Sequence, residues 1–186
     1  MPSLAEARAI LANSDVLFTK IEVDAATTRV AHEINRDYAE QYPLILSVMG
    51  GAVVFSGQLI SQLDFPLDFD IVQASRYGNA TVGHELTWRV APRDNIAGRH
   101  VLILDDILDE GVTLAAICDL VRKQGALSVE CAVFCQKDYG DVINAKKPLK
   151  AKYVGITVPN RFVFGYGMDV SGAWRNLPAI HAMHGK

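Results

Sequence analysis

Apolar residues along this chain follow two alternating patterns, one with helical spacing and one of short continuous runs. Two early segments have helical spacing: the first follows Ser3 as a candidate N-cap, and the second extends from about residue 25 to residue 42. Short apolar runs typical of buried strands come later, at 44–49, 70–74, 101–104, 128–135 and 153–157. Helical stretches lie between several of these runs, at 52–63 and after residue 113.

Strands that alternate with helices predict an α/β fold, a mostly parallel twisted sheet with helices on both faces. The polar segment 75–97 interrupts the alternation, and within it HELTWRV, residues 84–90, has the period-two pattern of an exposed hairpin strand. The chain has 186 residues, half of them hydrophobic, which is enough for one sizeable core and short for two. We therefore expect a single domain over residues 1–186.

The run VLILDDILDEGVT, residues 101–113, is the most informative stretch of the chain. Its apolar strand ends in Asp105 and Asp106 and then turns through Gly111 into a helix near Thr113. The free backbone N–H groups of a helix start, with the Thr113 hydroxyl, can hold a phosphate monoester. The two carboxylates repel phosphate and suit sugar hydroxyls or Mg²⁺. Ligands of parallel sheets bind at this end of the strands.

This spacing resembles the ribose-phosphate signature of the type I phosphoribosyltransferases, enzymes that use 5-phosphoribosyl 1-pyrophosphate (PRPP). The resemblance implies that Asp105 and Asp106 hold the ribose of PRPP and that the loop after them holds its phosphate. That loop consists of Glu110, Gly111, Val112 and Thr113. The family often has Ser or Thr in place of Glu110, so a hydroxyl donor is missing here, and the backbone donors can do the binding if the Glu110 side chain points outward. An ordinary strand, turn and helix with solvated acids is the alternative interpretation.

Four further segments resemble the 6-oxopurine branch of this family, the hypoxanthine-guanine phosphoribosyltransferases. Met49, Gly50 and Gly51 match a loop that binds pyrophosphate through main-chain N–H groups, usually with a cis peptide before the first Gly. A simple Gly-Gly turn is the alternative there. Arg175 matches an arginine that contacts pyrophosphate.

The family fold also implies a small hood and a mobile lid. The hood would comprise roughly residues 159–186 together with the N-terminal segment. The lid would lie within 75–97 and begin at Ser75, Arg76 and Tyr77, where it would keep water from the reacting ribose. Arg76 replaces the usual Ser, and it either neutralises departing pyrophosphate or lies on the surface of a hairpin.

Purine recognition is implied for Lys137, Phe162, Val163 and Asp169. A lysine ammonium has only donors, so Lys137 would pair with a 6-oxo group and reject the 6-amino group of adenine. Phe162 would stack on the base, Val163 would offer main-chain groups, and Asp169 would hold Mg²⁺ through water. Asp106 is a second candidate metal ligand. Taken singly, a lysine such as Lys137 is more often a surface residue, and Phe162 and Val163 are more often core residues.

The chain is therefore expected to move the 5-phosphoribosyl group of PRPP to N9, or an equivalent nitrogen, of hypoxanthine or guanine. The products would be IMP or GMP and pyrophosphate. Asp109, which lies between the ribose-binding acids and the phosphate loop, is the candidate base for the proton on N7. Mg²⁺ is the expected cofactor. A PRPP-binding regulatory sensor without catalysis and a transferase for xanthine or adenine are the alternatives.

The net charge limits the classes of binding partner that we expect, and the cysteine spacing indicates the compartment. The net charge of −3 provides no general field for nucleic acid or an anionic membrane, so we expect small-molecule substrates. The family resemblance implies a homodimer or homotetramer with the early helices as contact surfaces. The three cysteines match neither zinc nor redox spacing, which indicates a reducing compartment. Without a signal-like or membrane-length apolar segment, the protein is predicted to be cytoplasmic.

Overall fold

The computed structural model of the chain describes residues 1–76, 86–93 and 96–185. Its main sheet is six-stranded, in the order β4-β3-β2-β5-β6-β7. The strands are β2 (Leu44–Val48), β3 (Asp68–Arg76), β4 (Leu86–Val90), β5 (His100–Leu108), β6 (Ser128–Asp138) and β7 (Tyr153–Pro159). Neighbouring strands pair in parallel except for β3 and β4, which are antiparallel. The predicted mostly parallel sheet is confirmed, with β4 as the expected hairpin strand.

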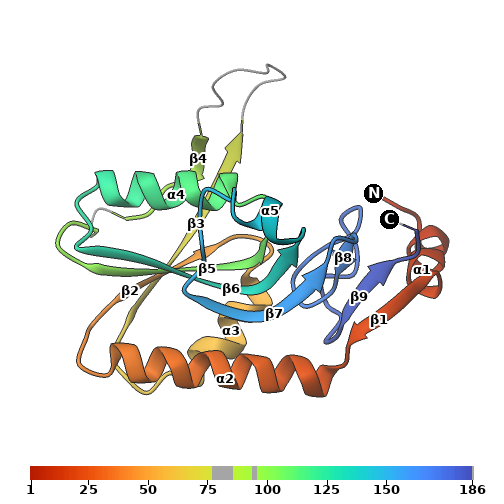
Figure 1. The fold of residues 1–186 in the computed structure, drawn as a ribbon, viewed down its shortest axis with the longest axis horizontal. Helices are drawn as coiled ribbons and strands as arrows, with labels where there is room; N and C mark the ends of the chain where they lie inside the picture. The colour runs from red at the N-terminus through yellow and green to blue at the C-terminus, as the bar shows by residue number, and fades with distance from the viewer. Residues whose placement is uncertain (77–85, 94–95, 186) are drawn as a thin grey trace.

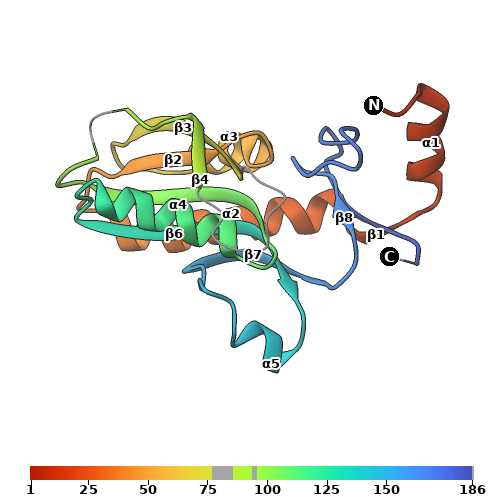
Figure 2. The same cartoon turned by 90° about the horizontal axis from the view of Figure 1, so that it is seen from above.

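Helices cover both faces of this sheet, which can be followed in Figure 1 and, from above, in Figure 2. The helices α2 (Lys20–Tyr38) and α3 (Val53–Ile60) pack below the sheet in Figure 1, and α4 (Val112–Lys123) packs above it. A short helix, α5 (Asp141–Asn144), follows β6. The predicted α/β architecture is therefore confirmed.

The alternation of side chains along β5 divides the interior into two hydrophobic clusters. Leu102 and Leu104 face α2 and α3, and Val101 and Ile103 face α4. All four are fully buried. Since successive residues of a strand point to opposite faces, a continuous apolar run is what a strand covered on both faces requires.

A second, three-stranded sheet, in the order β1-β9-β8, lies at one end of the main sheet beside both chain termini (Figure 1). It consists of β1 (Ser14–Phe18), β8 (Val163–Phe164) and β9 (Ile180–Met183), and α1 (Leu4–Ala12) precedes it. We call this sheet and the turns between β8 and β9 the hood. Its Tyr166 ring packs against Phe134 of β6 in a tilted arrangement, with the ring centroids 4.2 Å apart, and this contact joins the hood to the main sheet.

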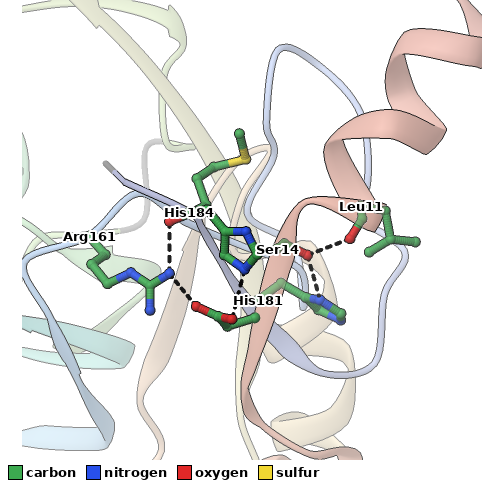
Figure 3. A network of polar contacts seen from close by, with 7 residues as sticks. Leu11, Ser14, Arg161, His181 and His184 are labelled. Atoms are coloured by element: carbon green, nitrogen blue, oxygen red, sulfur yellow. Dashed lines mark hydrogen bonds and ion pairs between the residues drawn. The ribbon is translucent and has the colours of Figure 1, made fainter.

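Polar contacts fasten the N-terminal strand to the C-terminal strand of the hood (Figure 3). The Arg161 guanidinium donates to Asp15 at 2.6 Å and to the Met183 carbonyl at 2.8 Å. The second Asp15 oxygen contacts His184 Nε2 at 2.8 Å. Residues at opposite ends of the sequence therefore form one unit.

Two predicted boundaries were wrong. The second helix begins at Lys20 rather than near residue 25, because Thr19 and Glu22 form a capping box, and it ends at Tyr38, before Pro43. The strand β5 does not end at the acids but continues through them to Leu108, because it keeps pairing with β6 as far as Gln136.

The predicted lid falls partly on residues that the structure leaves undescribed. The backbone of Ser75 and Arg76 ends β3, whereas Tyr77 and the residues up to 85 lie outside the described part of the chain. Among the residues that are described, we find no helix with the length and apolar character needed to cross a membrane.

Candidate active site

Segments from three neighbouring parallel strands meet at the carboxyl end of the main sheet. They follow or end β2, β5 and β6, which are adjacent in the sheet. A pocket of about 200 Å³ lies there, lined by Asp105 and by residues 107–114. The acid-rich run identified in the sequence therefore forms one concave surface, at the edge where parallel sheets bind ligands.

The helix α4 begins inside this pocket. Gly111 precedes it with a positive φ of 81°, a conformation that side chains other than glycine rarely adopt. The Gly111 carbonyl accepts from Ala115 at 2.9 Å, which is the first hydrogen bond of the helix. The N–H groups of residues 112–114, in the first turn of the helix, therefore have no intrahelical partners. These residues line the pocket, as an anion site requires. Glu110 and Thr113 are both exposed.

Asp105 and Asp106 lie at the inner side of this surface. Burial raises the pKa of Asp105 well above its usual range, and the neighbouring Asp106 charge raises it further. Burial also raises the pKa of Asp106, against the opposing effects of hydrogen bonds, including one from the Ile107 N–H, and of the Arg175 charge. Two adjacent carboxylates that are short of compensating charge favour a bound cation or hydroxyl donors.

The predicted pyrophosphate loop lies against these acids. The Met49–Gly50 peptide bond is cis, as the family resemblance implied. A Cβ atom on Gly51 would lie 1.7 Å from an Asp106 carboxylate oxygen, and a Cβ atom on Gly167 of the hood would lie 1.9 Å from the Gly51 carbonyl oxygen. The loop, the acid and the hood turn are therefore in direct contact, and only glycine fits at both positions.

Arg175 and Asp169 are brought to the same place by the hood. Arg175 Nη1 donates to the Gly167 carbonyl at 2.7 Å, and Nη2 contacts Asp169 Oδ1 at 2.5 Å. The other Asp169 oxygen accepts from the Gly172 N–H at 2.6 Å. The structure thus places the predicted pyrophosphate arginine beside the glycine loop.

Asp109 and Lys137 form an ion pair at the rim of the pocket. Lys137 Nζ lies 3.1 Å from Asp109 Oδ2, and the Lys137 side chain is 12% exposed whereas that of Asp109 is 46% exposed. The sequence placed these two residues in the same site without predicting their contact. A hydrogen-bond donor, Lys137, and an acceptor, Asp109, therefore lie side by side at the edge of the predicted phosphate pocket.

Tyr139 is a site residue that sequence reasoning missed. Its hydroxyl donates to the other oxygen of Asp109, Oδ1. The sequence offered no strand signal for it, because the predicted strand ends at residue 135 and β6 itself ends at Asp138, so the alternation of side chains along a strand does not extend to Tyr139.

Two predicted purine-binding residues, Phe162 and Val163, lie at the start of the hood. Phe162 is 45% exposed, and Val163 pairs with Ala182 in the hood. Their roles in purine binding stay predictions. Within residues 1–76, 86–93 and 96–185, no three His, Cys, Asp or Glu side chains converge as a preformed metal cluster.

Comparison with known proteins agrees with this geometry. The sequence model of the family described as "Phosphoribosyl transferase domain" matches residues 18–171. The hypoxanthine-guanine phosphoribosyltransferase of Bacillus subtilis is 34% identical to this chain over 166 residues, which are 89% of this chain and 90% of that protein.

Solved structures show the same likeness. A hypoxanthine phosphoribosyltransferase from Staphylococcus aureus aligns with a TM-score of 0.83 and 27% identity over 94% of each chain. A hypoxanthine-guanine phosphoribosyltransferase from Bacillus anthracis aligns with a TM-score of 0.79 and 27% identity, over 91% of this chain and 97% of that one.

The contact between Gly51 and Asp106 predicts the effect of adding one methyl group. Gly51→Ala should displace the Asp106 carboxylate, at an overpacking cost of about 1–3 kcal/mol. We expect PRPP to bind roughly 10-fold to 100-fold more weakly in the presence of Mg²⁺ when measured by calorimetry. Gly57→Ala on α3, where a Cβ atom meets nothing within 4 Å, is the matched control. Equal affinities of the two variants would refute the predicted contact.

The raised pKa of Asp105 predicts a pH-dependent stability. The pKa of an Asp in the unfolded chain is about 3.9. Above that pH, Asp105 binds more protons in the folded protein than in the unfolded chain, so the free energy of unfolding falls as pH rises. Asp105→Asn removes this charge. We expect it to raise the free energy of unfolding in urea more at pH 7 than at pH 4. The exposed Asp119→Asn is the control, and an equal change at both pH values would contradict the prediction.

Proposed function

The chain belongs to the phosphoribosyl transferase domain family, and we propose that it transfers the 5-phosphoribosyl group of PRPP to a 6-oxopurine, hypoxanthine or guanine. The observation that carries this proposal is the pairing of Lys137 Nζ with Asp109 Oδ2 at 3.1 Å. A 6-oxopurine with a proton on N7 presents an acceptor, O6, beside a donor. The purine edge can replace this ion pair, with O6 on Lys137 and the N7 proton on Asp109.

The same pair supports rejection of adenine. A 6-amino group would direct its hydrogens at the Lys137 ammonium, which has no acceptor. The contact would then lose its hydrogen bond and leave a partly buried cation unpaired. Hypoxanthine and guanine both present the oxygen, so this pair does not separate them.

The proposed reaction is a substitution at the anomeric carbon of the ribose. The bond from this carbon to N9 of the purine forms, and its bond to the pyrophosphate oxygen breaks, with the electron pair leaving on pyrophosphate. The N7 proton passes to Asp109. The N–H groups before α4 hold the 5-phosphate, and the loop 49–51 with Arg175 stabilises the leaving group by charge and hydrogen bonds.

Mg²⁺ is the proposed cofactor, and the residues at the site fit it. Asp105 and Asp106 are two adjacent carboxylates whose pKa values are raised first by burial, and a bound cation would offset that effect. Mg²⁺ keeps several waters and usually binds one or two carboxylates plus substrate phosphates, so it needs no preformed cluster of three protein ligands. When bound, the ion supplies neutralising charge to the pyrophosphate oxygens. Asp169 is the other proposed ligand, and its carboxylate forms an ion pair with Arg175.

A homodimer or homotetramer is proposed as the working form. The early elements support it, because no residue of α1 is buried and three of their apolar side chains are exposed: Leu4 in α1, Val16 in β1 and Ile21 in α2. Apolar surface of this kind is typical of contacts between subunits.

An assay of the purified protein with PRPP, Mg²⁺ and each purine in turn tests the function. We expect pyrophosphate release with hypoxanthine or guanine, and turnover with adenine that is lower by about 100-fold or more, because Lys137 cannot accept a hydrogen bond. Binding of PRPP without release for any base would favour the regulatory sensor. A preference for adenine or xanthine would assign a different substrate.

Substitution of the proposed base tests its role separately. Asp109→Asn should lower kcat by on the order of 10²–10⁴ while PRPP binding stays nearly unchanged, because the amide cannot take up the N7 proton. Stopped-flow or steady-state pyrophosphate release would measure the change, with Asp119→Asn as the control. An unchanged kcat would remove Asp109 from the mechanism.

A further inference from the structure

The carboxylate of Asp109 is held from two sides. Asp109 follows the end of β5 on the turn that leads to α4, so strand pairing does not fix its backbone. Its two oxygens have different partners: Oδ2 accepts from Lys137, and Oδ1 accepts from the Tyr139 hydroxyl. The direction in which Asp109 presents an oxygen to a ligand is therefore set by residues at the end of β6.

Tyr139 is itself fixed in place. Its N–H donates to Asn144 Oδ1 at 3.1 Å, which anchors the residue to α5. The Lys147 ammonium lies 5.2 Å from the centre of the Tyr139 ring and donates to the Lys137 carbonyl at 2.5 Å. A cation over the ring face and a hydrogen bond to the backbone restrict both the ring and the hydroxyl it carries.

In the proposed complex, the Lys137 ammonium turns from Asp109 toward O6 of the purine. This removes one of the two restraints on the carboxylate at the moment when its orientation matters. The Tyr139 hydroxyl contacts the opposite oxygen and need not move.

We propose that Tyr139 is a positioning residue for the proposed phosphoribosyl transfer, holding Asp109 so that Oδ2 faces the N7 proton once Lys137 has turned to O6. This inference rests on the proposed function. The Tyr139 hydroxyl contacts the site through its hydrogen bond to Asp109, so its effect on the reaction passes through Asp109.

The hydroxyl is suited to this role across the neutral range. Burial, followed by the hydrogen bond to Asp109, raises the pKa of Tyr139 to about 12. Tyr139 therefore stays protonated and remains a donor to the Asp109 carboxylate. A lysine could not replace it without adding a charge next to Lys137.

The test compares Tyr139→Phe with the wild-type protein in the pyrophosphate-release assay. The substitution removes the hydroxyl and keeps the ring under Lys147. We expect kcat with hypoxanthine or guanine to fall about tenfold, the loss typical of one hydrogen bond to a charged group. The KM for PRPP should stay unchanged, because residues 110–113 are untouched. An unchanged kcat, or a rise in the KM for PRPP that accounts for the whole loss, would overturn the proposal.

A double-mutant cycle separates positioning from general damage. In the Asp109→Asn background, Tyr139→Phe should cause no further fall in kcat, because the group it positions is gone. The same tenfold fall in both backgrounds would overturn the proposal. Tyr153→Phe is the matched control, since the Tyr153 hydroxyl donates to Asp37 at 2.9 Å away from the pocket, and it should leave kcat unchanged.

Failure of the proposed function would have a different signature. It would appear as a wild-type protein that releases no pyrophosphate with any purine, and the assignment of Tyr139 would fall with it. Active wild-type protein with fully active Tyr139→Phe would overturn the positioning role alone. Melting temperatures of all the variants show whether each one is folded at the assay temperature.

Discussion

The register of β5 determines the position of every group in the candidate site. Its four residues 101–104 are buried alternately against α2 and α3 on one face and against α4 on the other. A shift of one residue would exchange these faces, so the register is strongly fixed. The acids that follow must then lie at the carboxyl edge, and Gly111 must start α4 beside them. Burial of ordinary aliphatic side chains thus sets the geometry of the polar site.

In the absence of a ligand, the site lowers the stability of the fold. Asp105 and Asp106 are held together where water is scarce, and the pKa of each is raised because of it. Gly51 approaches Asp106 so closely that a Cβ atom at this position would displace the Asp106 carboxylate. The rest of the protein offsets the destabilisation at such a site, and a bound ligand relieves it. Functional sites commonly lower the stability of a fold in this way.

The local part of this account could be predicted from the sequence. The run 101–113 contains its own strand, acids, glycine and helix start, and the glycines at 50 and 51 follow a strand directly. The resemblance to a known family added the residues at 137, 169 and 175. These predictions concern short segments whose geometry follows from neighbouring residues.

Contacts between distant segments could not be predicted in the same way. The hood pairs Ser14 with Met183, and a pattern in either segment alone does not identify the other. The hydrogen bond from Tyr139 to Asp109 depends on the parallel pairing of β5 with β6, which places the ends of these strands side by side. The start of α2 is different, because the Thr-x-x-Glu spacing of its capping box, Thr19 and Glu22, is itself a local sequence signal.

The most direct test of the central claim is a crystal structure of the protein with IMP bound. The account predicts the phosphate on the amides of residues 111–113, O6 of the base on Lys137 Nζ, and Asp109 facing N7 with Tyr139 still on its other oxygen. A nucleotide bound while the contact between Lys137 and Asp109 stays intact, or a phosphate held elsewhere, would contradict it.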